Sequence, residues 1–370
     1  MKTPHIAIIC DWLIDFGGAE LVISHLLETF PDADIYTSVC YMDHPMLEGR
    51  NIYTSWLQRV PFFNRRHKLA GVLRPWAFRS FDLSGYDIII SSSSAEAKNA
   101  GYSKRGKDTK HFCYCHTPTR YYWSHYEEYR NMMEFGFFNA LARLVLDRLI
   151  GWLRKLDYEA AQRVDFFIAN SKNTQERIVK YYNRESEVIY PGVNIPVIPT
   201  AGEKGDYYIG IGRCIPYKRF DLLVDAFNTN GRRLVLCTAT DTHLFRELRS
   251  KSNSNIEWKY RVSNDEKDEL MKGAKAFLFP PLEDFGLVPI EAMAIGTPVI
   301  AYGKGGALET VVDGVTGVFF SPQTPEALNQ TIKQFEKMEW NSEKIREHAE
   351  KFSKKIFQEG IQEFIKNHAK

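Results

Sequence analysis

The sequence lacks a long hydrophobic run. Its longest apolar stretches, such as 277–281 and 87–90, are far shorter than the roughly 20 residues that a helix needs to cross a bilayer. No signal-like segment precedes Ile6, where the first apolar run begins. We therefore expect a cytoplasmic protein, or one that binds peripherally to the inner face of the cytoplasmic membrane.

An excess of one charge is also missing. The 48 Lys and Arg residues nearly balance the 46 Asp and Glu residues, which leaves a net charge of +2, and the two signs are interspersed. Proteins that bind nucleic acid through its phosphates carry clustered positive charge. A nucleic-acid partner is therefore not expected.

Cysteines are few, and none is placed for a disulfide framework. Cys113 and Cys115 alternate on one strand-like run, too close for an unstrained disulfide, and no neighbouring pair completes a zinc site. We expect reduced, mostly buried thiols at Cys10, Cys40, Cys113, Cys115, Cys214 and Cys237.

Two motifs for cofactors and metals are incomplete. Gly210 and Gly212 lie at the end of a strand-like run, but Ile215 stands where a dinucleotide fingerprint needs its third glycine, which weakens a nicotinamide interpretation. Asp32 and Asp34 have the spacing of an Asp-x-Asp pair, yet they precede a strand and are interpreted as turn residues. We therefore expect metal-independent chemistry and no dehydrogenase.

The length predicts more than one domain. At 370 residues the chain exceeds a usual single core, so two domains of about 180 residues each are expected. Residues 191–205 lack periodicity and are rich in Pro and Gly, which indicates a linker. The first domain then covers 1–190 and the second 206–349, and a C-terminal helix lies within 350–370.

Strand-like and helical runs alternate in both halves, which predicts an α/β protein. A long helix is expected over 141–162, and Ser171 or Asn170 can cap a helix that runs to Tyr182. The expected strands are 5–10, 34–40, 86–91, 110–115, 164–169, 188–190, 207–211, 234–237, 256–262, 274–279, 297–301 and 318–320.

The stretch 280–294 carries the strongest functional signal. It joins a buried strand to a helix with a proline in its first turn, so the amides of Phe285, Gly286 and Leu287 face a point that favours negative charge. Glu283 and Glu291 flank these amides and can accept hydrogen bonds from hydroxyls on both sides of a nucleotide diphosphate. An isolated pair of this kind is more often a loop charge and a first-turn acid.

A second signal is a pair of cations after the strand at 207–211. Arg213 and Lys218 lie in a glycine turn that opens a helix at Phe220. Basic residues at a helix start are unfavourable with the helix dipole unless an anion is present. Two such cations can hold both phosphates and offset the charge of a departing diphosphate; the alternative is surface charge.

Two further segments in the first half follow strands. Gly17 and Gly18 form a turn between a strand and a helix, where backbone amides can approach an anion or a sugar, although an ordinary tight turn is the simpler interpretation. His116 ends the strand at 110–115, at the edge where open α/β sheets bind ligands. The alternative for His116 is a core histidine that bonds a backbone carbonyl.

Aromatic residues follow His116, and another aromatic cluster lies nearer the N-terminus. Arg120, Tyr122 and Trp123 can contact a sugar acceptor or serve packing. Residues 56–79 interleave cations with large aromatics, which fits either a face that rests on an anionic bilayer or a solvated helix pair with core aromatics.

The motifs recur in an order that resembles family 4 of the retaining glycosyltransferases, which have the GT-B fold. They are Gly-Gly-Ala-Glu at 17–20, His-Thr-Pro-x-Arg-Tyr at 116–121, Asn-Ser at 170–171, Gly-Arg-x4-Lys at 212–218 and Glu-x7-Glu at 283–291. The resemblance implies two Rossmann-like doubly wound domains that face each other across a cleft, with a C-terminal helix that crosses back to the first domain. The donor would be held mainly by the second domain.

The resemblance also implies roles for single residues. Glu283 would bind the hydroxyls of the donor sugar and Glu291 those of the ribose, while Arg213 and Lys218 would clamp the diphosphate. Gly17 and Gly18 would form a donor loop. The segment of Arg261 and Val262 would touch the nucleotide base, mostly through its backbone, and His116 would contact the donor hexose near the reacting carbon.

The resemblance around His116 is to bacterial polysaccharide mannosyltransferases. It implies transfer of mannose from GDP-mannose to a lipid-linked saccharide in lipopolysaccharide or exopolysaccharide assembly, with retention of configuration. Three alternatives stay open: a UDP-sugar donor, a sugar-nucleotide epimerase of the same architecture, and a catalytically silent partner subunit.

Overall fold

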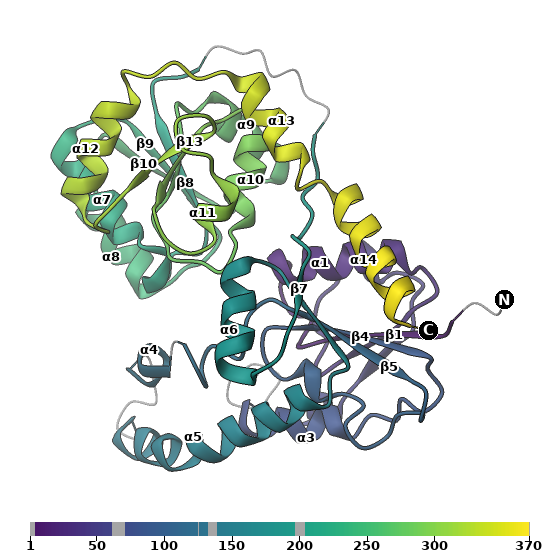
Figure 1. Cartoon of the computed structure of the whole chain (residues 1–370). Coiled ribbons are helices and arrows are strands. Elements are labelled where there is room, and N and C mark those ends of the chain that lie inside the picture. The colour runs from purple at the N-terminus through teal and green to yellow at the C-terminus, as the bar shows by residue number, and fades with distance from the viewer. Residues whose placement is uncertain (1–3, 61–70, 125, 132–138, 197–203, 370) are drawn as a thin grey trace. The chain divides into compact units, whose positions relative to one another are not determined.

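The computed structural model describes residues 4–60, 71–124, 126–131, 139–196 and 204–369, and the chain forms two compact units (Figure 1). One unit comprises Met1–Pro191 with Phe357–Lys370, and the other comprises Gly192–Ile356. Each contains one parallel sheet with connecting helices, which confirms the expected α/β architecture. Part of the expected linker, 197–203, lies outside the described residues.

The first unit has a seven-stranded sheet in the order β3-β2-β1-β4-β5-β6-β7. The strand order reverses between β1 and β4. Its strands are β1 (Ile6–Cys10), β2 (Asp34–Thr37), β3 (Ile52–Thr54), β4 (Ile88–Ser93), β5 (Lys110–Cys115), β6 (Phe166–Ala169) and β7 (Glu187–Val188). Its α-helices are α1 (Gly18–Thr29), α3 (Arg74–Arg79), α4 (Tyr126–Asn131), α5 (Asn139–Gln162) and α6 (Lys172–Tyr182), and its 3-10 turns include η1 (Pro45–Leu47), η2 (Trp56–Arg59) and η4 (Ala97–Asn99).

Local sequence explains these elements. Every residue of β1, β2 and β4 is buried, as expected for parallel strands that are covered on both faces. Ser171 caps α6 as expected, because its hydroxyl accepts a hydrogen bond from the amide of Thr174 at 3.0 Å. All six cysteines are free, and five of them are buried.

Helix α14 (Lys354–His368) packs on the first unit. Its apolar residues Phe357, Ile361 and Phe364 join the core that also contains residues of β1 and β4. The ring of Phe364 lies edge-on to Phe112 of β5, with 6.0 Å between the ring centroids. The C-terminal helix therefore completes the core of the domain that begins the chain, as expected.

This helix starts later than a continuous helix from residue 350 would. Helix α13 ends at Glu350, and a short bridge to Val193 intervenes. The amide of Val193 donates to the carbonyl of Phe352 at 2.8 Å, and the carbonyl of Val193 accepts from the amide of Lys354 at 3.0 Å. The bridge takes up backbone groups that a continuous helix would need.

The second unit has a six-stranded sheet in the order β10-β9-β8-β11-β12-β13. Its strands are β8 (Tyr208–Ile211), β9 (Leu234–Thr238), β10 (Ile256–Tyr260), β11 (Phe277–Phe279), β12 (Val299–Tyr302) and β13 (Gly317–Phe320). Its helices are η6 (Pro216–Lys218), α7 (Phe220–Asn230), α8 (His243–Lys251), α9 (Asn264–Gly273), α10 (Leu287–Ala294), α11 (Ala307–Thr310), α12 (Pro325–Phe335) and α13 (Ser342–Glu350).

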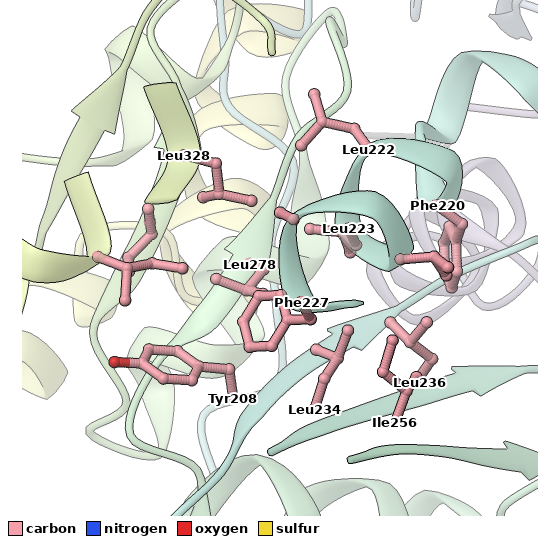
Figure 2. Close-up of a cluster of buried hydrophobic side chains, with 14 of the residues drawn as sticks. Tyr208, Phe220, Leu222, Leu223, Phe227, Leu234, Leu236, Ile256, Leu278 and Leu328 are labelled. Atoms are coloured by element: carbon pink, nitrogen blue, oxygen red, sulfur yellow. The ribbon is translucent and has the colours of Figure 1, made fainter. Parts of the chain in front are cut away.

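Helix α7 anchors the core of this unit (Figure 2). Phe220, Leu223 and Phe227 recur at helical spacing and are all buried. They join Leu234 and Leu236 of β9 in one apolar cluster. This packing fixes α7 against the strands whose ends carry the candidate site.

Several strand boundaries differ from expectation. The runs 34–40 and 256–262 end as strands at Thr37 and Tyr260. At the second boundary the chain turns because Arg261 adopts a left-handed φ of 56°. Strand β3 was not expected, because a three-residue edge strand leaves no readable alternation.

Candidate functional site

The strand order in the second unit reverses between β8 and β11, which is where open α/β sheets bind ligands. The segment after β8 carries Arg213 and Lys218, and the loop after β11 carries Glu283. Parallel strands end at the same edge, so the fold brings together residues that lie far apart in sequence. A small cavity of about 10 Å³, lined in part by Lys218 and Pro281, lies between these strand ends.

Lys218 and Glu283 form an ion pair at this point. Each side chain is only 16% exposed. The sequence predicted that a cation near the start of a helix requires an anion. In the structure that anion is a carboxylate of the same chain.

The neighbouring arginines differ in role. Arg213 is exposed, and its Nη2 donates to the hydroxyl of Tyr217 at 3.0 Å. Arg219 precedes α7 in a left-handed conformation, and its guanidinium contacts Asp221 at 3.1 Å and Gln323 at 2.8 Å. Arg219 therefore shapes the turn, whereas Arg213 presents its charge at the surface.

Helix α10 begins directly after the loop of Glu283. Its N-cap residue is Gly286, whose φ of 92° favours glycine, and no side chain caps the helix. A Cβ at Gly286 would lie 2.9 Å from the ring of Phe279. Phe285 is buried, and Leu287 is half-buried. Glycine at position 286 is therefore required by the space available as well as by the backbone conformation.

A second glycine pair, Gly305 and Gly306, lies before α11 and supports this loop. The amide of Gly306 donates to the carbonyl of Glu283 at 2.9 Å. A Cβ at Gly306 would overlap the backbone of Phe285, and a Cβ at Gly305 would lie 2.5 Å from the carbonyl oxygen of Glu283. The backbones of the two loops are thus in direct contact, and side chains at either glycine would displace the loop of Glu283.

Glu291 lies one to two turns into α10 and is paired with Lys267 of α9 at 3.0 Å. Sequence reasoning missed Lys267, because nothing in its local pattern separates it from other helical lysines. The two carboxylates expected to bind hydroxyls are therefore both held by lysines.

Arg261 and Val262 follow β10, at the same edge of the sheet. The amide of Arg261 donates to the carbonyl of Thr238 at 3.0 Å, and its guanidinium lies 5.1 Å from the ring centroid of Tyr260. Arg261 is exposed, and Ser263 then caps α9. The segment is thus held by backbone contacts, with its side chains near the surface.

The first unit has a switch point of its own, between β1 and β4, and a buried carboxylate occupies it. Asp11 accepts hydrogen bonds from the amides of Ser94 at 2.7 Å, Ala95 at 2.9 Å and Ala97 at 2.8 Å. Sequence reasoning missed this role of Asp11. The sequence signal that could have revealed it is an acidic residue directly after a buried strand.

Gly17 directly precedes α1, Gly18 is the first residue of that helix, and both are exposed. Gly17 is the N-cap of α1 and offers no side-chain hydrogen bond to the helix. Its φ of -150° is not restricted to glycine, but a Cβ there would lie 3.3 Å from the carboxylate of Glu20. The turn is thus open to the surface at the start of a helix.

His116 follows β5 at the same edge of the first sheet and is partly exposed. Its Nε2 lies 2.8 Å from the hydroxyl of Ser92, and its carbonyl accepts from Thr174 at 3.2 Å. These contacts orient the imidazole without burying it.

The three expected acceptor residues have different environments. Tyr122 is only 3% exposed, and its hydroxyl bonds Glu96 at 3.1 Å, so the structure supports packing rather than acceptor contact. Trp123 is half-buried and donates from Nε1 to Asp157 at 2.8 Å. Arg120 is half-buried and keeps part of its surface accessible.

A buried ion pair fixes the loop that carries His116 and Arg120. Lys98 donates to Asp157 at 2.6 Å and to the hydroxyl of Thr119 at 3.0 Å. Burial lowers the pKa of Lys98, but the charge of Asp157 more than offsets this and raises it overall. Sequence reasoning missed this pair, because its members are 59 positions apart, from Lys98 to Asp157.

The described part of the 56–79 block contains both buried and exposed side chains. Arg74 is buried in an ion pair with Glu96 at 3.0 Å, and Phe78 belongs to the core. Trp56 and Trp76 are exposed by 42% and 37%. Residues 61–70 lie outside the described residues.

Among the described residues, His, Cys, Asp and Glu side chains form no group of three that could hold a metal ion. Asp34 begins β2, where its carboxylate accepts from Tyr86 at 2.6 Å and from Asn51 at 2.9 Å. No helix in the described part of the chain combines the length and the apolarity that crossing a bilayer requires.

The sequence matches two family descriptions that together cover most of the chain. Residues 16–196 match Glycosyltransferase Family 4, and residues 194–355 match Glycosyl transferases group 1.

Curated relatives match over part of their length. An uncharacterised glycosyltransferase of Methanocaldococcus jannaschii is 31% identical over 53% of this chain and 57% of its own. The alpha-1,3/1,6-mannosyltransferase of Saccharomyces cerevisiae is 26% identical over 54% and 49%, and the O-antigen chain mannosyltransferase of Salmonella typhimurium is 25% identical over 48% and 53%. The chain thus matches about half the length of these relatives.

Solved structures match over the whole chain. The lipopolysaccharide outer core galactosyltransferase WaaB is 18% identical, with a TM-score of 0.69 over 98% of this chain and 99% of its own. HepE of Anabaena, in complex with UDP and glucose, is 19% identical, with a TM-score of 0.69 over 98% and 100%. These likenesses concern the fold. The chain belongs to glycosyltransferase family 4 and has the GT-B fold.

Proposed function

We propose that this protein transfers mannose from GDP-mannose to a lipid-linked saccharide during assembly of a surface polysaccharide. The observation that carries the proposal is the gathering of Arg213, Lys218, Glu283 and the start of α10 at one switch point. The choice of mannose rests on the segment around His116 and on mannosyltransferases among the relatives, such as those of Saccharomyces cerevisiae and Salmonella typhimurium.

The donor diphosphate would be bound by Arg213, by Lys218 and by backbone amides at the start of α10. Glu283 would accept hydrogen bonds from hydroxyls of the hexose, and Glu291 from those of the ribose. Because Lys218 and Glu283 are paired with each other, donor binding would exchange their ion pair for one contact to phosphate and one to sugar. The base would lie against Arg261 and Val262.

We propose transfer with retention through an oxocarbenium-like state. The bond between the anomeric carbon and the phosphate oxygen breaks, and the acceptor oxygen attacks the same face. The acceptor proton passes to the departing diphosphate. Arg213 and Lys218 offset the charge that grows on this leaving group, a task that a metal ion performs elsewhere, so no metal is included. His116 would contact the hexose near the reacting carbon.

The proposal is tested by incubating the protein with GDP-mannose, GDP-fucose, UDP-glucose, UDP-galactose and UDP-N-acetylglucosamine. Hydrolysis or transfer, and stabilisation against heat, are recorded for each nucleotide sugar. Turnover of GDP-mannose with a lipid-linked acceptor is expected. Turnover of a UDP-sugar with none of GDP-mannose would refute the donor.

A UDP-sugar is the second candidate donor, because the structural relative HepE was solved with UDP and glucose. The nucleotide panel separates the two donors directly. An epimerase of the same architecture would instead release an altered free sugar when no acceptor is present, which analysis of the soluble products detects.

A further inference from the structure

A single glutamine connects the two segments that carry Lys218 and Glu283. Gln323 lies in the loop after β13, a strand that β12 separates from β11 in the sheet. Its Oε1 accepts a hydrogen bond from Nη1 of Arg219 at 2.8 Å, and its Nε2 donates to the carbonyl of Pro280 at 2.7 Å. A guanidinium can only donate and a carbonyl can only accept, so these partners fix the direction of the side-chain amide. Both ends of the amide are therefore used, one for each segment.

At one end, the contact satisfies a buried backbone group. Strand β11 ends at Phe279, and Pro280, the first residue of the loop, is buried. A buried carbonyl needs a hydrogen-bond donor. Gln323 supplies this donor three residues before Glu283, so a side chain from another part of the sheet holds the start of the loop.

At the other end, the contact holds the residue that directly follows Lys218. Arg219 has a φ of 56°, a left-handed conformation that is uncommon for residues other than glycine and that persists where surrounding contacts enforce it. Its guanidinium also donates from Nε to Asp221 at 3.1 Å, so its charge is already balanced within the chain. The role of Arg219 is therefore to hold the turn rather than to supply a third free charge for a diphosphate.

This bridge has a role that the ion pair of Lys218 and Glu283 cannot perform. The ion pair holds the two segments together only while its members bind each other. Donor binding, as proposed above, separates them, because the ammonium moves to phosphate and the carboxylate to sugar. The contacts of Gln323 involve neither of these groups, so they persist when the donor is bound.

We propose that Gln323 is a positioning residue, which keeps the turn of Lys218 and the loop of Glu283 at the spacing that one nucleotide sugar requires. The inference rests on the proposed function, which assigns both groups to the donor. A fixed spacing matters most in the transition state, where the cation must lie against the charge that grows on the leaving diphosphate. Loss of the bridge should therefore lower kcat more than it weakens donor binding.

The test is Gln323→Met, which keeps nearly the same side-chain length and removes both hydrogen bonds. At saturating acceptor, kcat should fall by about tenfold while the KM for the donor changes much less. The loss is smaller than that expected for removal of Lys218, because the cation itself remains. Gln334→Met makes the same substitution at an exposed position of α12 and should keep both constants. Thermal unfolding confirms that both variants are folded.

A second background separates positioning from an independent effect. In Lys218→Gln the cation is already absent, so its placement no longer matters. Lys218→Gln/Gln323→Met should therefore be slower than Lys218→Gln by no more than about threefold. A further loss of about tenfold in this background would show that Gln323 acts independently of Lys218, and it would overturn the proposal.

A measurement without donor separates this proposal from the proposed function. Amide hydrogen exchange of residues 280–287, followed by mass spectrometry, should be several-fold faster in Gln323→Met than in the parent chain, because the start of the loop has lost a contact that holds it. Exchange in Gln334→Met should match that of the parent chain. If the parent chain uses a UDP-sugar, the donor assignment fails, and the same kinetic comparison is made with that sugar.

Two further results would overturn the proposal. One is a parental kcat in Gln323→Met, because the bridge would then shape the loop without placing its reactive groups. The other is a lower kcat with unchanged exchange, which would show that Gln323 acts by touching the substrate rather than by holding the loop. A parent chain that turns over no nucleotide sugar would refute the proposed function, and the exchange measurement alone would then decide whether Gln323 holds the loop.

Discussion

Lys218, in the turn after β8, forms an ion pair with Glu283, in the loop after β11. The two residues are the cation and the carboxylate that the family resemblance assigned to neighbouring parts of one ligand, the diphosphate and the donor sugar. When no donor is bound, the ammonium of Lys218 and the carboxylate of Glu283 neutralise each other at a site that is largely shielded from water. Neither charge is then left uncompensated. We expect the pair to separate when the donor binds.

Lys218→Gln tests the role of this cation. The variant cannot offset charge on the departing diphosphate, so we expect turnover of the nucleotide sugar to fall by about a hundredfold or more. Steady-state rates with saturating donor and acceptor measure the effect. Arg249→Gln, which removes an exposed cation of α8, is the control and should keep the parental rate. Parental turnover in Lys218→Gln would contradict the assignment.

Glu291→Gln tests the proposed ribose contact. Because the ribose does not react, losing one hydrogen bond to it should raise the KM for the donor by about tenfold and change kcat much less. Donor titration at fixed acceptor separates the two constants. Glu269→Gln, at an exposed position of α9, should leave both unchanged. A lower kcat at an unaltered KM would speak against a binding role.

Gly306→Ala tests the contact between the two loops. Its methyl group would overlap the backbone of Phe285, so the loop of Glu283 must move. We expect a loss of about 1–3 kcal/mol in the free energy of unfolding, together with weaker donor binding. Urea unfolding and donor titration measure these effects. Gly85→Ala, where no atom lies within 4 Å of the new Cβ, should be nearly neutral.

Lys98→Met tests the buried ion pair behind the loop of His116. It leaves the carboxylate of Asp157 without its cation in a buried site, so we expect a loss of about 3–5 kcal/mol in the free energy of unfolding. The double variant Lys98→Met/Asp157→Asn removes both charges, keeps an oxygen that accepts from Trp123 and Tyr182, and should recover much of that loss. Urea unfolding of the parent chain, of each single variant and of the double variant completes the double-mutant cycle. An additive double variant would show that the two charges act independently.

His111 predicts a pH dependence of stability. Burial, and then the charge of Arg105, lowers its pKa from 6.5 to about 3. Between these values the unfolded chain binds a proton that the folded chain does not, so stability is full above about pH 6.5 and falls as the pH drops toward 3. The slope from this one group is up to about 1.4 kcal/mol per pH unit.

The measurement is the Tm between pH 7 and pH 5, in steps, for the parent chain and for His111→Gln. Glutamine can still bond Ser91 but does not titrate, so a shallower decline is expected. His243→Gln, whose parent side chain is 94% exposed, is the control and should follow the parental curve. An equally steep decline in His111→Gln would assign the acid sensitivity to other groups.

Local sequence was sufficient for most elements of the fold. Buried runs such as β5 and the cap at Ser171 depend on residues that are close together in the chain. For that reason periodicity and capping predicted them almost at their observed positions. The C-terminal break near Ser353 could not be predicted in this way, because it depends on a bridge to Val193.

The candidate site, like the fold, combines features that the sequence predicted with features that only the structure shows. The sequence by itself determined the family and the residue types at 213, 218, 283, 286 and 291, because each belongs to a short motif. Only the tertiary structure decided which of these groups meet: Lys218 with Glu283, Lys267 with Glu291, and Gly306 with the backbone of Phe285. The physical reason is that charge pairing and steric contact depend on distance in space, and here the sheet, rather than the local chain, sets that distance.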